Sequence, residues 1–190
     1  YPRIDHAQVG PPRMQSYRVI VVENRFVKLT FLPELGGRIY QATIKASGQP
    51  LFYQNPVIKP GYFGQRGWWL GVGGLEWAVP TQEHGYLEYL PWEATLQRSP
   101  AGDLTVQHTI LEQQRNFQVA SMVNLAPDEA RFTVALAVTN TAQQPQPLQM
   151  WSNAMLTPGH SNQIGASFRF VVPTDTMIVH ATQDPHLPGA

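Results

Sequence analysis

Apolar and polar residues alternate with a period of two along three successive segments in the second half of the chain, residues 104–110, 117–125 and 132–139. Their apolar positions are Leu104, Val106, Ile110, Phe117, Val119, Val123, Leu125, Phe132, Val134, Leu136 and Val138. Side chains that alternate in this way point to opposite faces of a β-strand, so the pattern predicts three strands with one face toward a core. The turn-like segments 112–116 and 126–129 between them favour an antiparallel meander.

Proline and glycine limit what the rest of the chain can form. The 17 Pro and 15 Gly are spread along 190 residues, which disfavours long helices. Residues 18–32 are predicted to form a β-hairpin that turns at Asn24 and Arg25, and residues 148–156 and 168–172 two further strands. We therefore expect an all-β fold, an antiparallel β-sandwich that forms one domain over residues 1–190, with loosely ordered ends at 1–16 and 183–190.

Composition excludes several partners and chemistries. With 13 Lys and Arg against 13 Asp and Glu, the chain lacks the basic surface that nucleic acids require. No apolar run approaches the roughly 18 residues of a membrane span, and the absence of Cys removes disulfide and thiolate chemistry. The six His form no pair three or four residues apart, and no phosphate or dinucleotide loop is present. We expect no metal, cofactor, nucleic acid or membrane partner, and the compartment stays open.

Aromatic residues and glycines are concentrated between Phe52 and Trp92. This stretch holds half of the chain's Phe, Tyr and Trp residues together with seven Gly. Because glycine lets the backbone bend sharply and approach a ligand closely, we expect irregular chain that forms the wall of a pocket. The alternative is that these rings plug the mouth of the sandwich.

Charged groups in the same stretch suggest what such a pocket binds. They are Arg66, Glu76, Glu83, His84, Glu88 and Glu93. Aromatic rings stack on the C–H faces of sugars, and charged side chains satisfy the sugar hydroxyls, so carbohydrate is the first ligand class to consider. His84 can exchange a proton near neutral pH. Glu76 with Glu83 or Glu88 is a second possibility, an acid and base pair for glycoside hydrolysis.

Several motifs resemble the galactose mutarotase-like (aldose 1-epimerase-like) superfamily. They are Gly36-Gly37-Arg38-Ile39-Tyr40, Asn55-Pro56-Val57-Ile58-Lys59-Pro60, Arg66-Gly67, Gly74-Leu75-Glu76-Trp77, the run His84 to Glu93, and Trp151-Ser152-Asn153-Ala154. Together they are similar to an uncharacterised branch often joined to tetratricopeptide repeats. The resemblance implies a β-supersandwich, of which this chain is an N-terminal portion, with a sugar groove on the concave face of its larger sheet.

The same resemblance implies that His84 is a sugar-contacting His and that Arg66 contacts substrate hydroxyls or phosphate. With these two residues we expect Trp68, Trp77, Trp151 and Asn153 to bind the substrate, and His84 and Glu76 are the candidate catalytic residues. Where the family has its general-acid His this chain has Trp151-Ser152-Asn153, and the family's catalytic Glu is expected beyond Ala190.

These departures favour a carbohydrate-binding domain without turnover. One alternative is an aldose 1-epimerase-like isomerase that uses His84 with a carboxylate. A second is a structural sandwich that self-associates, as a homodimer, through exposed strand edges.

Overall fold

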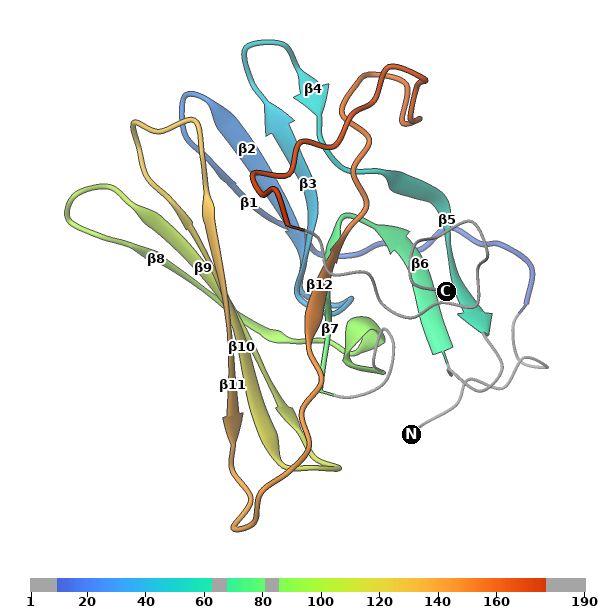
Figure 1. Ribbon diagram of the computed structural model, residues 1–190, viewed down its shortest axis with the longest axis vertical. Helices are drawn as coiled ribbons and strands as arrows, with labels where there is room; N and C mark the ends of the chain where they lie inside the picture. Colours follow the sequence, from blue (N-terminus) through green and yellow to red (C-terminus); the bar gives the residue numbers. More distant parts are fainter. Residues whose placement is uncertain (1–9, 63–67, 81–85, 177–190) are drawn as a thin grey trace.

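The computed structural model describes residues 10–62, 68–80 and 86–176. Almost all of its regular structure is β-strand, and every strand pair is antiparallel, which confirms the predicted all-β sandwich (Figure 1). The elements are β1 (Ile20–Glu23), β2 (Val27–Leu32), β3 (Arg38–Ile44), β4 (Gln49–Pro50), β5 (Gln54–Tyr62), β6 (Trp68–Gly73), β7 (Leu75–Ala78), the 3-10 helix η3 (Tyr86–Tyr89), β8 (Glu93–Arg98), β9 (Leu104–Glu112), β10 (Phe117–Leu125), β11 (Thr133–Asn140) and β12 (Trp151–Ala154).

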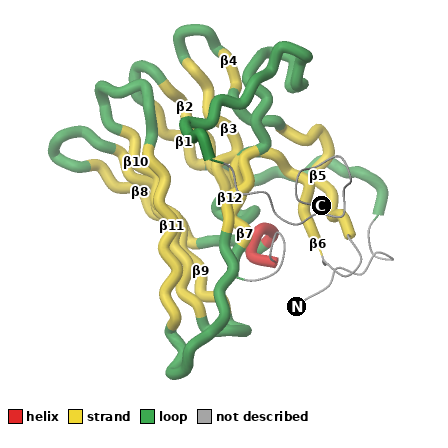
Figure 2. The backbone as a smooth tube through the Cα atoms, in the orientation of Figure 1, coloured by secondary structure: helices red, strands yellow, loops and turns green. Residues whose placement is uncertain are grey.

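Two sheets form the layers of the sandwich. The larger sheet has the order β1-β2-β3-β7-β12, with β4 added to β3, and the second sheet has the order β11-β10-β9-β8. A separate hairpin of β5 and β6 lies beside the larger sheet, and η3 lies next to β7, as the tube in Figure 2 shows. The described part of the chain contains no helix that is long and apolar enough to span a membrane.

The core lies between the two sheets. Leu29, Phe31 and Ile39 from the larger sheet pack in one cluster with side chains of the second sheet, among them Val106, Val123 and Leu125. Val106, Val123 and Leu125 are among the inward positions that the period-two pattern predicted. Burying each such side chain contributes about 1.5–3 kcal/mol, which favours packing the two sheets face to face.

Both clear strand patterns of the sequence are confirmed. The N-terminal hairpin turns at Asn24, whose side-chain oxygen accepts hydrogen bonds from the N–H groups of Phe26 and Val27 at 2.8 and 2.9 Å. The meander of the second half is β9, β10 and β11, with all three strands in continuous register. A fourth strand of that sheet, β8, had no prediction.

Three expectations differ from the structure. The strand over residues 148–156 is restricted to β12, because Leu148 and Met150 are exposed and pair with no strand. The strand over residues 168–172 is absent, and Phe170 and Val171 are 77% and 90% exposed. Residues 52–92 are more regular than expected, since β5, β6, β7 and η3 lie there. Residues 183–190 are outside the described residues.

Candidate polar site on the larger sheet

A buried cluster of charged side chains lies on the face of the larger sheet that is opposite the core. Arg38, at the start of β3, is fully buried. Its Nε donates to the carbonyl oxygen of Leu35 at 2.8 Å, and Nη2 to that of Glu88 at 3.0 Å. Nη1 donates to the carbonyl oxygen of Gly73 at 3.2 Å and pairs with Glu76 Oε2 at 3.3 Å. The guanidinium therefore ties β3, β6, β7 and η3 together.

Two glycines before Arg38 allow this close approach. Gly36 and Gly37 have φ angles of +77° and +58°, which side-chain-bearing residues rarely adopt. A Cβ on Gly36 would lie 2.6 Å from the backbone oxygen of Glu88. The N–H of Gly36 also donates to the carbonyl oxygen of Leu90 at 3.0 Å. The paired glycines thus seat η3 directly on the turn that leads into β3.

Glu76 connects the cluster to the edge strand β12. Residues 76 and 153 are direct partners in the register of β7 and β12. Asn153 Nδ2 donates to Glu76 Oε1 at 3.1 Å, while Glu76 Oε2 faces Arg38. The Glu76 side chain is 1% exposed, whereas Asn153 is half-buried. Asn153 is therefore the member of this chain of contacts that reaches toward solvent.

Glu88 is the second buried carboxyl group of the cluster. Its Oε1 accepts the N–H of Leu70 at 2.6 Å, and within the described residues no hydrogen-bond partner reaches Oε2. Burial, followed by the charge of Glu76, raises the pKa of Glu88 to about 9 against the opposing effect of Arg38. Glu88 is consequently protonated and uncharged at neutral pH. The Arg38 cation then faces a single carboxylate, that of Glu76.

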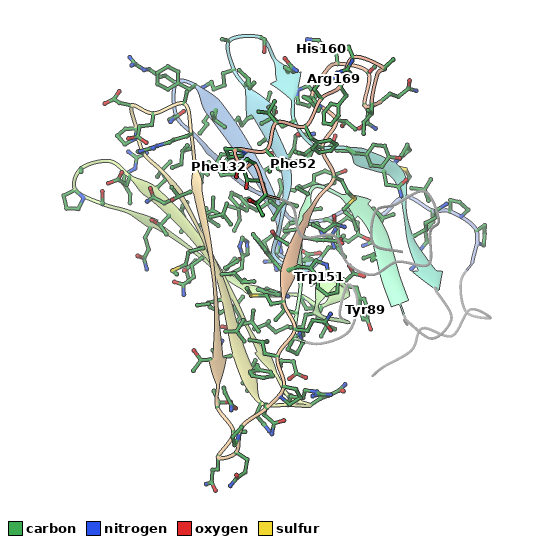
Figure 3. All side chains as sticks on the ribbon, in the orientation of Figure 1. Phe52, Tyr89, Phe132, Trp151, His160 and Arg169 are labelled. Carbon is green, nitrogen blue, oxygen red and sulfur yellow. The ribbon has the colours of Figure 1, made fainter. Side chains whose placement is uncertain are left out.

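Three half-buried aromatic residues lie within two positions of cluster residues along the chain. Trp151 precedes Asn153 by two residues on β12, so both side chains are on the same face of the strand. Tyr40, two residues after Arg38 on β3, and Tyr89, next to Glu88, are half-buried, and burial raises the pKa of both phenols. Figure 3 labels Trp151, which begins β12, and Tyr89, which ends η3. These rings are therefore carried by β3, η3 and β12, the same elements that carry Arg38, Glu88 and Asn153.

The predicted site residues have different positions in the structure. Glu76, Trp151 and Asn153 come together on one face. Trp77 lies on the opposite face of β7, is 2% exposed, and donates from Nε1 to the carbonyl oxygen of Gly37 at 3.1 Å, so it belongs to the core between the sheets. Trp68 begins β6. Arg66 and His84 lie outside the described residues.

Arg38 is the central residue of the cluster, and the sequence analysis assigned it no role. In the sequence, Arg38 stands directly after paired glycines at the start of a strand. An Arg side chain in a strand is either exposed or, if it is buried, paired with specific partners. Glu88 had been considered only as an alternative partner of Glu76. The structure brings these two carboxyl groups into electrostatic contact.

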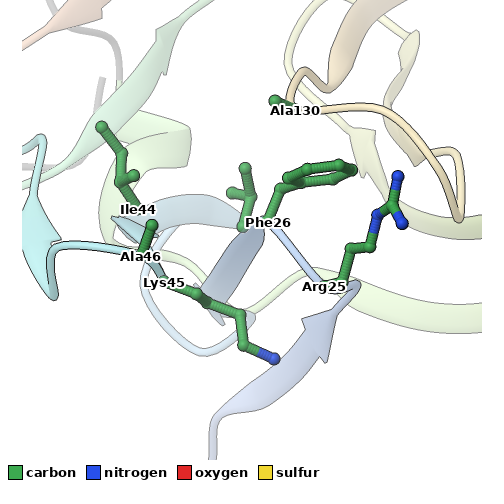
Figure 4. A pocket seen from close by; sticks show the side chains of 7 residues that line it. Arg25, Phe26, Ile44, Lys45, Ala46 and Ala130 are labelled. Atoms are coloured by element: carbon green, nitrogen blue, oxygen red, sulfur yellow. The ribbon is translucent and has the colours of Figure 1, made fainter.

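A hollow with a volume of about 460 Å³ lies where β2 begins and β3 ends (Figure 4). Its lining is mainly apolar and includes Phe26 and Ile44. The cations beside it already have partners, since Arg25 lies 4.4 Å from the centre of the Phe26 ring and Lys45 Nζ lies 3.3 Å from Glu23 Oε1. This hollow offers few polar groups to a ligand.

Two solved structures are similar to this chain. A TPR-domain containing protein from Parabacteroides distasonis ATCC 8503 is 26% identical with a TM-score of 0.66, over 72% of this chain and 23% of that protein. The Slr1438 protein from Synechocystis sp. PCC 6803 is 16% identical with a TM-score of 0.49, over 70% of this chain and 51% of that protein. The chain thus spans about a quarter of the TPR-domain protein, and this similarity agrees with the expected relation to tetratricopeptide-repeat proteins. Residues 1–184 match the model of one protein family over nearly the whole sequence, and the chain therefore belongs to the family described as "Domain of unknown function (DUF5107)".

Proposed function

We propose that this chain is a carbohydrate-binding domain of the galactose mutarotase-like type, and that it holds a sugar against the β7–β12 face at Trp151 and Asn153. The observation that carries the proposal is the pairing of a half-buried ring with a half-buried, oriented amide on one strand face. The sequence motifs quoted above support the same assignment.

The amide of Asn153 is fixed by its contact with Glu76. Because Nδ2 donates to the buried carboxylate, Oδ1 is directed the other way, and within the described residues it makes no hydrogen bond. A carbonyl oxygen held in this orientation accepts a hydrogen bond from a sugar hydroxyl without losing side-chain freedom on binding. The buried Arg38–Glu76 pair therefore supports Asn153 in a binding role.

The ring on the same strand face as Asn153 suits the apolar part of a sugar. Trp151 is half-buried, and an aromatic ring packs against the C–H groups of a sugar. A ligand that stacks on Trp151 and bonds to Asn153 has one apolar face and hydroxyls around its edge. Pyranose sugars have this combination.

The carboxyl groups favour binding over catalysis. Glu76 and Glu88 are each 1% exposed, and Glu76 already contacts Arg38 and Asn153. In glycoside hydrolysis both carboxyl groups have to reach the scissile bond. These two buried groups are not accessible to a sugar in their described positions. Isomerase activity that depends on His84 stays a prediction, because that residue lies outside the described part of the chain.

Calorimetric titration with a panel of aldoses and oligosaccharides tests the proposal. We expect Trp151→Ala to weaken binding at least about tenfold, which corresponds to about 1.4 kcal/mol, and Asn153→Ala to weaken it as well. Phe170→Ala is the matched control, since this ring is 77% exposed and contacts the ring of Phe168. Absence of heat with every sugar, or unchanged affinity in Trp151→Ala, would contradict the proposal. Polarimetry of fresh α-glucose and α-galactose reports separately on turnover.

A further inference from the structure

Strand β11 ends the second sheet, and its outer edge is paired with no other described strand. Among the described residues, no backbone hydrogen bond joins the following connection, residues 141–150, to residues 133–139. Figure 1 shows β11 at the end of its sheet. In an antiparallel strand every second residue directs its N–H and C=O away from the partner, so this edge presents a row of backbone groups that pair with no other described strand.

This edge lacks the features that keep sheet edges apart in other proteins. Such edges carry charges, prolines or bulges, or they are very short. The opposite edge strand of the same sheet, β8, begins with Glu93 and ends with Arg98, and the edge strands β1 and β12 of the larger sheet have only four residues each. By contrast, β11 is eight residues long, is uncharged, contains neither Pro nor Gly, and pairs with β10 without a bulge.

The sequence of β11 is also symmetric. Residues 133–139 read Thr-Val-Ala-Leu-Ala-Val-Thr, which is identical in both directions about Leu136. When two copies of a strand pair antiparallel about a two-fold axis, directly opposite residues must come from the same face. An axis at Leu136 satisfies this condition and places Thr133 opposite Thr139, Val134 opposite Val138, and Ala135 opposite Ala137.

Each of these pairs is compatible with a shared sheet. Thr–Thr and β-branched apolar pairs stabilise antiparallel sheets, and no like charges meet. On the inner face, Val134 is 39% exposed, while Leu136 and Val138 are only partly buried against the core cluster. A second copy would cover these side chains. On the outer face the exposed, small Ala135 and Ala137 allow close approach.

We propose that two copies of this chain associate through β11, antiparallel and centred on Leu136, so that their four-stranded sheets join into one continuous sheet. The interface is isologous, as expected for a two-fold dimer. It is independent of the sugar-binding face, since it involves none of the residues assigned there.

Analytical ultracentrifugation over a series of protein concentrations tests this interface. We expect the wild-type chain to reach twice its mass of 21.3 kDa. Ala135→Lys with Ala137→Lys puts two Lys pairs face to face and is expected to give 21.3 kDa throughout. The matched variant, Ala135→Lys with Ala137→Glu, puts Lys opposite Glu twice and is expected to restore the dimer. Both positions are exposed, and unchanged circular dichroism of each variant verifies that it is folded.

Cysteine cross-linking tests the register. The chain has no Cys, so a disulfide can form only at introduced positions. A mixture of Ala135→Cys chains with Ala137→Cys chains should cross-link on oxidation, and more than either variant alone, because these positions are directly opposite across the axis. A wild-type monomer at every concentration, a dimer that survives the two Lys substitutions, or failure of the mixture to cross-link would overturn the proposal.

Discussion

The protein buries ionisable side chains on both faces of its larger sheet. On one face the buried group has hydrogen-bond and ion-pair partners, and on the other face it has none among the described residues. On the outer face, Arg38 is surrounded by backbone carbonyl oxygens and by Glu76, so it is buried together with its partners. On the core side, His108 of β9 lies against Phe31, with ring centres 5.5 Å apart, and neither of its ring nitrogens has a hydrogen-bond partner within the described residues.

The difference is in the charge state that each environment permits. A buried charge is tolerated only when other groups replace the water that it loses. Arg38 has these groups, whereas His108 has none, and burial lowers the pKa of His108 to about 4. His108 is therefore neutral at neutral pH. The polar cluster is organised around a charge, and the inter-sheet core excludes one.

The largest expected effect is on the polar cluster. Arg38→Met leaves Glu76 buried without its cation and three carbonyl oxygens without a donor, so we expect the free energy of unfolding to fall by about 3–5 kcal/mol. Urea denaturation measures this loss. Arg18→Met is the control, because the Arg18 side chain is 90% exposed in its pair with Glu34, and it should change stability far less. Equal effects of the two variants would contradict the expectation that the buried Arg38–Glu76 pair matters more to stability than the exposed Arg18–Glu34 pair.

The second-largest effect is a loss of stability at low pH, caused by His108 in the core between the sheets. Because the pKa of His108 is about 4 in the folded chain and 6.5 as the ordinary value, the unfolded chain binds the proton more readily. Stability should therefore fall as the pH drops from about 6.5 to 4, by about 3 kcal/mol in total at about 1.4 kcal/mol per pKa unit. His108→Met should remove this loss. Unfolding measurements at several pH values test this. A parallel loss of stability in the wild type and in His108→Met would contradict the assignment of the acid effect to His108.

Glu88 should give the opposite pH dependence. Its pKa is about 9 in the folded chain against an ordinary value of 4.5, so its contribution is complete below pH 4.5 and is lost as the pH rises toward 9. Glu88→Gln mimics the protonated group, because the amide can still accept from Leu70. We expect little change below about pH 4.5 and a flatter stability profile between about pH 4.5 and 9. A profile that kept the wild-type slope would show that Glu88 does not titrate in this range.

The smallest effect is expected at Ser121, the cross-strand partner of His108. Its buried hydroxyl has no hydrogen-bond partner within the described residues. Removing an unsatisfied polar group costs little or is stabilising, so Ser121→Ala should change the free energy of unfolding by less than about 1 kcal/mol. A loss well above this in urea denaturation would contradict an unpartnered hydroxyl at Ser121.

Strong local patterns made part of this fold predictable. The alternation in β9 and β10 identified the inward residues, because a strand with one buried face needs period two whatever its neighbours are. Asn24 signalled its hairpin turn in the same way. The pattern at residues 168–172 failed, because a short apolar run forms a strand only when a neighbouring strand offers its edge, which the sequence does not record.

The candidate site was only half predictable for a related reason. Residue types pointed to Glu76, Trp151 and Asn153, and the structure brings them together. The same reasoning also selected Trp77, because residue type alone does not say which face of a strand points to the core. It assigned no role to Arg38, whose partners are mainly backbone carbonyl oxygens contributed by distant segments.

The sequence by itself determined the all-β class, the antiparallel meander and the uncharged, palindromic strand, since each depends on residues adjacent in the chain. The tertiary structure decided that Arg38, Glu76, Glu88 and Asn153 meet, and that His108 is buried without a partner. Those facts depend on how residues many positions apart approach one another, and this approach determines which charges are compensated and which groups must stay neutral.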